Sequence, residues 1–342
     1  QAAFDDHILI LSPFEERYDE QRAFFTEGTE LFEKGRIFYS RRIGNTPVGH
    51  ESVEDDLGVN EEIIDNPNSV NMLNAIKVSG RTKKGLGIGF FNAITEKTSA
   101  KIKITTTDEV RSMVTEPLAN YNVLVLDQQF NKNSSISLIN TSVIRDGMFR
   151  DANVTALEYD VSTKSNKYNV FGNFKRSSVR EPGENKKGYS AFLNLSKTFG
   201  NVQYELEHSI RNKTYDIKDL GFQSRNNYSR TTAGISYEIF EPTKTFERFK
   251  IGLEASLRYL YEPHVYYGNE FELDEIFFTN NRFAFGLDIE TNLGEQHDYY
   301  EPRSDGRYYT ENGVFEAGVW ISTDYRKKFA VDVRTNYATR FN

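Results

Sequence analysis

The sequence predicts an all-β protein, an antiparallel transmembrane β-barrel, and three observations carry this prediction. Apolar and polar residues alternate with period two along most of the chain. The alternating runs are about 10 to 13 residues long, which suits a tilted membrane strand better than an ordinary strand of five or six. The links between runs alternate between short and long, as in barrels with short periplasmic turns and longer extracellular loops.

The alternation divides the chain into about 15 expected strands. They lie near residues 36–43, 74–81, 86–95, 119–130, 134–144, 152–162, 167–176, 187–197, 202–212, 230–240, 248–261, 265–277, 283–292, 314–323 and 329–339. Tight turns fall near 83–85, 131–133, 199–201, 280–281 and 324–327, and longer links at 44–73, 96–118, 177–186, 213–229 and 293–313. A soluble sandwich would have no reason to keep short and long links on opposite sides.

The polar residues of the cleanest runs, from about residue 187 onward, are expected to face a water-filled lumen. Val202, Tyr204 and Leu206, for example, alternate with Glu205 and Glu207. In a membrane barrel the apolar set faces lipid and the polar set faces the interior. The expected lumen-lining residues are Glu205, Glu207, Glu254, Arg258, Asp288, Glu290, Asp332 and Arg334. Aromatic pairs near the strand ends, such as Tyr259 with Tyr261, are further expected to form girdles at the membrane interfaces.

The order of short and long links sets an expected orientation and strand number. The first strand would run outward, so residues 1–35 form a periplasmic or lumenal N-terminal segment and residues 36–342 the barrel. The fifteenth strand would also run outward, whereas a closed barrel of this kind needs an even count. The expectation is therefore 16 or more strands, at least one of them after Asn342, in a bacterial outer membrane with the N-terminus periplasmic.

The N-terminal segment mixes charged and aromatic residues, which suits either a plug inside the barrel or a docking surface. The residues that indicate this are Glu15, Arg17, Arg22, Phe24, Phe25 and Glu27. Charges inside a barrel are common because the lumen is polar. A structural ion-pair network is thus the default reading, and acid–base chemistry is not expected.

Composition and motifs exclude several other classes. The net charge of −8 argues against a nucleic-acid partner, and the absence of cysteine excludes a disulfide framework and a thiolate metal site. The acidic stretch from Glu51 to Asp65 lacks the spacing of a calcium loop and suits a solvated loop near lipopolysaccharide. The five histidines are scattered. No cofactor, metal site, catalytic residue or enzyme activity is expected.

Several stretches resemble a family of Bacteroidota outer-membrane barrels described as domain of unknown function 5916. They are Phe24–Gly28, Ile37–Gly44, Gly80–Thr82 with Leu86–Gly89, Glu116–Pro117 with Asn120–Val123, Arg150–Thr155, Asp219–Phe222 and Ser322–Tyr325. The resemblance spans essentially the whole chain. It implies an outer-membrane barrel, and members often carry an N-terminal module similar to family-9 carbohydrate-binding domains, which nothing in this chain matches. No catalytic residue is carried over by the resemblance.

Two functions from different classes follow as hypotheses. The first is a channel or uptake component for glycans or similar solutes, with outer-membrane lipid and lipopolysaccharide around it. The second is a non-conducting structural or interaction barrel that docks onto a secretion or outer-membrane assembly complex. An open lumen would favour the channel, and a lumen filled by residues 1–35 would favour the scaffold. A glycan hydrolase using lumenal carboxylates ranks third, because it needs two carboxylates about 5 to 10 Å apart around a cleft.

Overall fold

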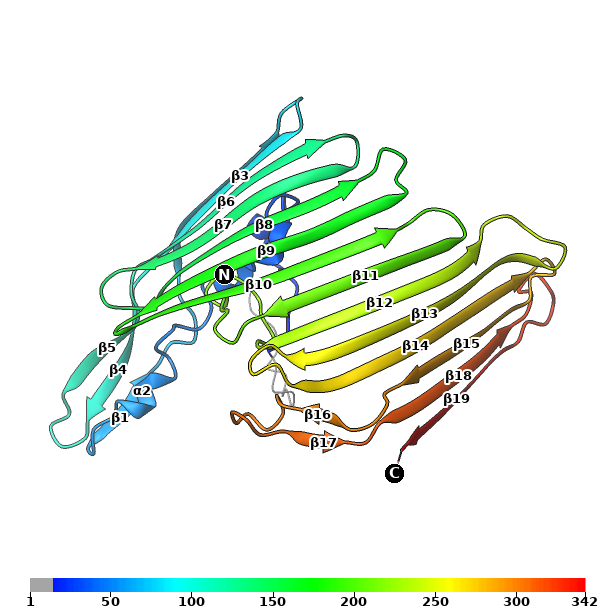
Figure 1. The fold of residues 1–342 in the computed structure, drawn as a ribbon. Helices are drawn as coiled ribbons and strands as arrows, with labels where there is room; N and C mark the ends of the chain where they lie inside the picture. The colour runs from blue at the N-terminus through cyan, green and yellow to red at the C-terminus, as the bar shows by residue number, and fades with distance from the viewer. Residues whose placement is uncertain (1–14, 342) are drawn as a thin grey trace.

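The computed structural model describes residues 15–341, and this part of the chain is all-β and antiparallel. Its main element is one 14-stranded sheet, curled along its width (Figure 1). The strands are β2 (Met72–Arg81), β3 (Leu86–Thr95), β6 (Ala119–Phe130), β7 (Ser134–Arg145), β8 (Asp151–Ser162), β9 (Tyr168–Glu181), β10 (Glu184–Lys197), β11 (Val202–Arg211), β12 (Tyr228–Ile239), β13 (Phe246–Leu260), β14 (Tyr266–Thr279), β15 (Ala284–Thr291), β18 (Val314–Ser322) and β19 (Asp332–Arg340). Strands next to one another in this order are hydrogen bonded.

The sheet is open: β2 and β19 are its two edges and are not paired with each other. Fourteen strands also correct the expected fifteen, so the odd-count argument for a missing strand does not hold. The expected long link at 177–186 is a tight hairpin, because β9 and β10 continue pairing up to Glu181 and Glu184. The other expected strands of this sheet lie within a few residues of their predicted bounds.

The predicted strand at 36–43 is wrong. This segment contains two single-turn 3-10 helices, η1 (Lys34–Arg36) and η2 (Ser40–Arg42). Its apolar residues Ile37 and Ile43 are fully buried. Residues 36–43 have the composition of a strand. Strand propensity, however, describes how well side chains fit a pleated sheet surface. Here the segment packs on the face of a sheet and does not pair with its strands.

Two smaller sheets lie where only links were expected. One is formed by β1 (Glu61–Asp65), β4 (Thr98–Ile104) and β5 (Val110–Glu116), with the short helix α2 (Ser52–Asp55) beside it. Val53 of α2 packs on Ala100 and Ile102 of β4. The other is the hairpin of β16 (Gln296–Asp298) and β17 (Tyr309–Glu311). In Figure 1 both project from the same end of the strands of the large sheet.

The two faces of the large sheet differ in composition. Antiparallel partners share a face, and residues i and i+2 of one strand share it too. On one face, here called the outer face, large apolar side chains are solvent-exposed; examples are Val78, Phe90, Leu124, Leu138, Phe174, Leu195, Leu206, Ile235, Leu253, Val319 and Val333. The opposite, inner face carries the core over β3–β8 and mostly polar residues over β9–β19.

Among the described residues, no helix has both the length and the apolar character required to span a bilayer.

Candidate functional site

Residues 15–43, called the N-terminal segment from here on, pack on the inner face of β3, β6, β7 and β8. Its short helix α1 (Ala23–Thr26) brings Phe24 and Phe25 to Phe91 of β3, with ring centroids 6.3 and 5.8 Å away. Phe32 and Phe38 approach the same ring at 6.4 and 5.4 Å. Phe91 is 1% exposed, so burial of these aromatic rings is the main apolar contribution that holds the segment on the large sheet, called the wall from here on.

Polar contacts fix the path of this segment. The Arg22 guanidinium lies 2.8 Å from Glu20 and donates hydrogen bonds of 2.8 Å to the carbonyl oxygens of Ser40 and Ile43. Burial alone would raise the pKa of the Glu20 carboxyl, but hydrogen bonds from Arg22 and Ser40 outweigh it and hold the pKa at about 2. Glu15 pairs with Arg42 at 2.6 Å. These contacts tie the chain before α1 to η2 and to Ile43 beside it.

The other residues expected in a plug or docking surface also contact this structure. The Arg17 guanidinium lies 5.6 Å from the centre of the Tyr39 ring. The ammonium of Lys77, on β2, donates to the backbone carbonyl oxygens of Phe24 and Glu27. The side chain of Phe24 is 39% exposed, whereas Phe25 is buried. The expected segment began at residue 1; residues 1–14 lie outside the described part of the chain.

The link between β11 and β12, residues 212–227, folds back over the same face. The amide of Tyr39 donates to the carbonyl of Leu220 at 2.7 Å, and Arg42 Nε donates to the carbonyl of Gly221 at 2.9 Å. Tyr215 of this link is fully buried, and its backbone lies against Gly188 of β10 so closely that a Cβ at Gly188 would clash with it. The link and the N-terminal segment therefore pack as one unit against the wall.

A buried ion network joins this unit to the wall. Arg145, at the end of β7, contacts Glu116 and Asp219, each at 2.8 Å, and all three side chains are no more than 4% exposed. Arg150 extends the network to Asp219 at 2.8 Å and, beyond it, to Asp216 and Glu181. Burial opposes the charge on Arg150, but the hydrogen bonds and charge of Asp219 outweigh it and raise the pKa of the guanidinium.

Sequence reasoning did not find this network as a site, yet it pointed to its parts. Glu116, Arg150 and Asp219 each open one of the stretches that carry the family resemblance. Only the fold brings them together, since Arg145 is 29 residues from Glu116 and 74 from Asp219 along the chain. A second cluster has the same character: fully buried Asp127 accepts from Ser137 at 2.7 Å and pairs with Arg81 at 2.6 Å.

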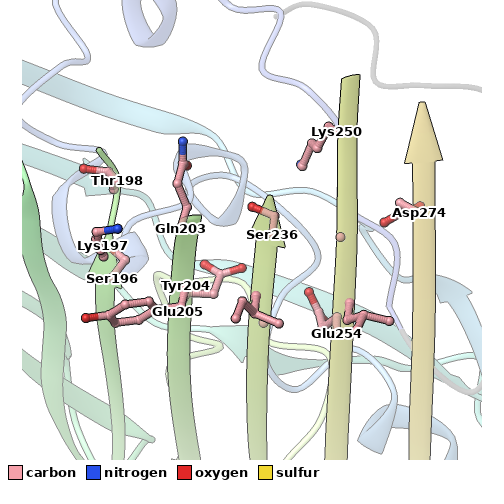
Figure 2. Close-up of a pocket in the computed structure, with 14 residues that line it drawn as sticks. Ser196, Lys197, Thr198, Gln203, Tyr204, Glu205, Ser236, Lys250, Glu254 and Asp274 are labelled. Atoms are coloured by element: carbon pink, nitrogen blue, oxygen red, sulfur yellow. The ribbon is translucent and has the colours of Figure 1, made fainter. Parts of the chain in front are cut away.

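The eight residues expected to line a lumen all lie on the inner face. All but Glu207, which lies at the margin of the covered part, are over the part of the sheet that the N-terminal segment does not cover. Register connects them: Glu205 faces Gly234, which faces Glu254, and Glu254 is opposite Glu272. Glu272 is opposite Glu290, and Glu290 is opposite Glu316. We call Glu254, Glu272, Glu290 and Glu316 the glutamate row; it crosses four neighbouring strands. Figure 2 shows Glu205 of β11, Glu254 of β13 and Asp274 of β14, which line a hollow of about 230 Å³.

The remaining expected residues flank this row. Asp288 lies two residues from Glu290, and Arg334 approaches Asp288 at 3.9 Å. Arg258 approaches Glu270 at 3.9 Å, and Glu207 accepts a 2.8 Å hydrogen bond from Asn194. Asp332, the first residue of β19, accepts a hydrogen bond from the Tyr325 hydroxyl. The sequence did not single out Glu272, Asp274 or Glu316, although each continues the same alternation.

No group of three or more His, Asp or Glu side chains within residues 15–341 is arranged to hold a metal ion. The acidic stretch is spread over and between α2 and β1, and two of its members pair with cations. Glu61 pairs with Arg111 at 2.7 Å, and Asp65 with Lys101 at 3.7 Å. The Arg111 hydrogen bonds hold the pKa of the Glu61 carboxyl at about 2.

Comparison with known proteins gives one match. No curated protein matches the chain, and no solved structure does. A family model described as "Domain of unknown function (DUF5916)" matches residues 1–342, the entire sequence given. The expected resemblance is therefore confirmed at the level of the family: the chain belongs to the family of domain of unknown function 5916.

Proposed function

We propose that this protein is part of an outer-membrane β-barrel that admits glycans or similar polar solutes along the uncovered, acidic side of its lumen. The observation that carries the proposal is the division of the large sheet into an apolar exposed face and a polar opposite face. In such a barrel the N-terminal segment would narrow the lumen on the side that it covers. The glutamate row would line the part of the lumen that stays open.

The exposed apolar face supports a lipid environment. Soluble monomers rarely expose apolar patches larger than a few hundred Å². Here exposed apolar side chains recur from β2 to β19, with Val78 62% exposed at one edge and Val333 51% at the other. Outward-facing apolar bands of this kind are typical of membrane barrels, in which lipid covers such residues.

Two groups of aromatic rings on the outer face support the same reading. Near the short-turn end, Phe249, Phe277 and Phe285 stack in sequence, with centroids 5.4 and 4.9 Å apart. Near the other end, Tyr259 packs against Tyr266 at 5.6 Å. Phe249 and Tyr259 are on one strand, about ten residues or roughly 33 Å apart. At a tilt of about 40° this spans roughly 25 Å, the height of the apolar band of a membrane barrel.

A closed wall is part of the proposal. In hydrocarbon every backbone N–H and C=O must be hydrogen bonded, so the free edges of β2 and β19 could not face lipid. We propose that further strands join these edges in a barrel of 16 or more strands. The partners that this environment implies are outer-membrane lipid and lipopolysaccharide, with the N-terminus on the periplasmic side.

A scaffold is the second candidate, and the buried ion network favours it. The Arg145 and Arg150 pairs fix the 212–227 link on the large sheet, and Tyr39 and Arg42 bond the N-terminal segment to this link. The two segments are therefore not arranged as a plug that swings away. A barrel narrowed in this permanent way could serve to dock a secretion or assembly complex.

Planar-bilayer conductance of the full-length protein, with and without oligosaccharides, separates the two candidates. We expect steady conductance that prefers cations, because carboxylates line the open side. Replacing Glu254, Glu272 and Glu290 together by Gln should reduce the cation preference, measured as the reversal potential in a salt gradient. Glu62→Gln, on the three-stranded sheet, is the control and should leave it unchanged. A folded but electrically silent protein would reject the channel and lead to pull-down of scaffold partners.

A further inference from the structure

A cavity of about 840 Å³ lies between the wall and the N-terminal segment, apart from the glutamate row. Strands β8 to β12 form one side, and the N-terminal segment and the 212–227 link form the other. Its volume is within the roughly 300 to 1,000 Å³ of pockets that hold small molecules. Aromatic rings from both sides line it: Phe38, Tyr39, Phe171, Phe192, Phe222 and Tyr228.

Four cationic side chains, Arg17, Arg36, Lys175 and Arg211, line this cavity, against three carboxylates. Arg36 and Lys175 line it, and the side chain of neither forms a hydrogen bond or an ion pair with the described residues. Arg211 joins them from β11, where one nitrogen of its guanidinium donates to the Arg225 carbonyl. The positive charges of Arg211 and Arg36 act on Lys175, against the opposite effect of Glu158. Like charges held together in a partly enclosed space repel one another, and an anion between them would relieve the repulsion.

The carboxylates that line the same cavity are already engaged. Glu158 accepts from the Gly35 amide at 3.0 Å and lies 3.7 Å from the Lys34 ammonium. Glu207 accepts from Asn194 at 2.8 Å, and Glu33 from the Thr29 hydroxyl at 2.9 Å. Each of these carboxylates therefore has a hydrogen-bond or ion-pair partner, whereas the side chains of Arg36 and Lys175 have none among the described residues.

Tyr215 gives an independent indication. Its side chain is fully buried, it lines the cavity, and its hydroxyl has no hydrogen-bond partner among the described residues. Arg211 lies over the Tyr215 ring at 5.4 Å, and Arg211 Nε is likewise buried without a partner. Buried polar groups are hydrogen bonded in the great majority of cases, so two unsatisfied donors at one cavity indicate an acceptor that enters it.

We propose that this cavity binds a small organic anion with a ring-shaped body, whose carboxylate or phosphate is held by Lys175, Arg36 and Arg211. The Tyr215 hydroxyl donates to the same ligand, and the aromatic walls cover its ring. The site goes beyond the proposed channel and does not depend on it, because the cavity lies on the covered side of the sheet.

Calorimetric titration of the full-length protein in detergent tests the site with four probes of related shape. Glucuronate and glucose 6-phosphate place a carboxylate or a phosphate on one ring, glucose keeps the ring without charge, and inorganic phosphate keeps the charge without the ring. We expect glucuronate or glucose 6-phosphate to bind, and the tighter of the two identifies the anionic group. Glucose binding as tightly would overturn the anion site, and inorganic phosphate binding as tightly would overturn the role of the aromatic walls. Binding by none of the four would overturn the proposal.

Two variants locate the binding. Lys175→Gln should weaken binding roughly tenfold, the effect of one charge-assisted hydrogen bond. Lys250→Gln is its control, because Lys250 is a cation on the inner face of β13 outside the cavity, and it should bind as the unmodified protein does. Equal weakening by both would overturn the assignment.

Tyr215→Phe separates ligand binding from folding. It removes only the unsatisfied hydroxyl, so we expect unchanged or higher thermal stability with weaker binding. Unchanged binding would remove Tyr215 from the site. Conductance is a separate measurement, so failure of the anion site and failure of the channel are distinguishable.

Discussion

Arg145 and Glu116 form an ion pair of 2.8 Å between Nε and Oε1, with each side chain only 3% exposed. Arg145 neutralises Asp219 as well, at 2.8 Å. Buried pairs of this kind add little net stability, because desolvation offsets the attraction between the charges. They do make one arrangement unique, since a displaced partner leaves a buried charge unpaired. In this protein the unique arrangement is that of the 212–227 link on the wall.

Removing Arg145 should therefore cost far more than removing an exposed arginine. Arg145→Met leaves Glu116 and Asp219 without their partner, and we expect the free energy of unfolding to fall by about 3–5 kcal/mol. Arg180→Met is the control: Arg180 also pairs with an aspartate, at 2.7 Å, but is 73% exposed. It should cost no more than about 1 kcal/mol. Urea unfolding in detergent, followed by the fluorescence of the single tryptophan, measures both; equal losses would contradict the network's role.

Gly188 tests how closely the 212–227 link lies on β10. A Cβ at this position would clash with the backbone of Tyr215 and Thr214. We expect Gly188→Ala to displace the link and to speed cleavage by trypsin after Lys213 and Lys218. Gly80→Ala on β2 adds the same methyl group where no atom lies within 4 Å, and it should leave cleavage unchanged. Slow cleavage in both variants would show that the link adapts to the added group.

Phe91 tests the apolar contact of the N-terminal segment. Phe91→Ala removes a ring that is 1% exposed and that Phe25, Phe32 and Phe38 surround. We expect a loss of about 3–5 kcal/mol in unfolding free energy. Phe90→Ala, on the outer face and 43% exposed, is the matched neighbour and should cost clearly less. A larger loss for Phe90 would place the main apolar contact of β3 on the outer face.

The sequence predicted the strands of the large sheet better than the segments that pack on its inner face. The run Leu86–Thr95 is the strand β3, as predicted. Successive residues of this strand face the buried inner side and the exposed outer side in turn, and this produces the alternation in the sequence. The prediction of a strand at 36–43 was wrong for the opposite reason. Ile37, Tyr39 and Ile43 are buried between the sheet and the 212–227 link, so no alternation of environments constrains its backbone.

The candidate sites divide in the same way. Glu205 and Glu290 could be placed on the inner face from periodicity alone, since partners in register keep one face throughout the sheet. The Arg145 network and the Lys175 cavity could not. Their members come from segments far apart in the sequence, and no local pattern encodes the distance between Arg145 and Asp219 or between Lys175 and Arg36.

The glutamate row should destabilise the sheet slightly, and two glutamates of β14 allow a matched test. Glu272 is directly opposite Glu254 and Glu290, whereas Glu270 lies near Arg230 at 3.6 Å and Arg258 at 3.9 Å. Like charges directly opposite each other are unfavourable. We expect Glu272→Gln to raise the melting temperature at low salt and Glu270→Gln to lower it, with both effects smaller at 1 M salt. The same sign for both would show that charge pairing along the row is not what sets stability.

Glu20 and Arg22 make the anchoring of the N-terminal segment dependent on acid. The folded pKa of Glu20 is about 2, against about 4.3 for an unperturbed glutamate, because the Arg22 and Ser40 hydrogen bonds outweigh the effect of burial. A depressed folded pKa gives a stabilisation that is complete above the unfolded pKa and is lost as the pH falls toward the folded value. We therefore expect the segment to loosen between about pH 4 and pH 2. Hydrogen exchange of residues 20–43 would measure this, with Glu20→Gln as the variant that lacks the Glu20 contribution to the pH dependence. An identical pH profile in the variant would assign the acid response to other carboxylates, such as those around Arg145.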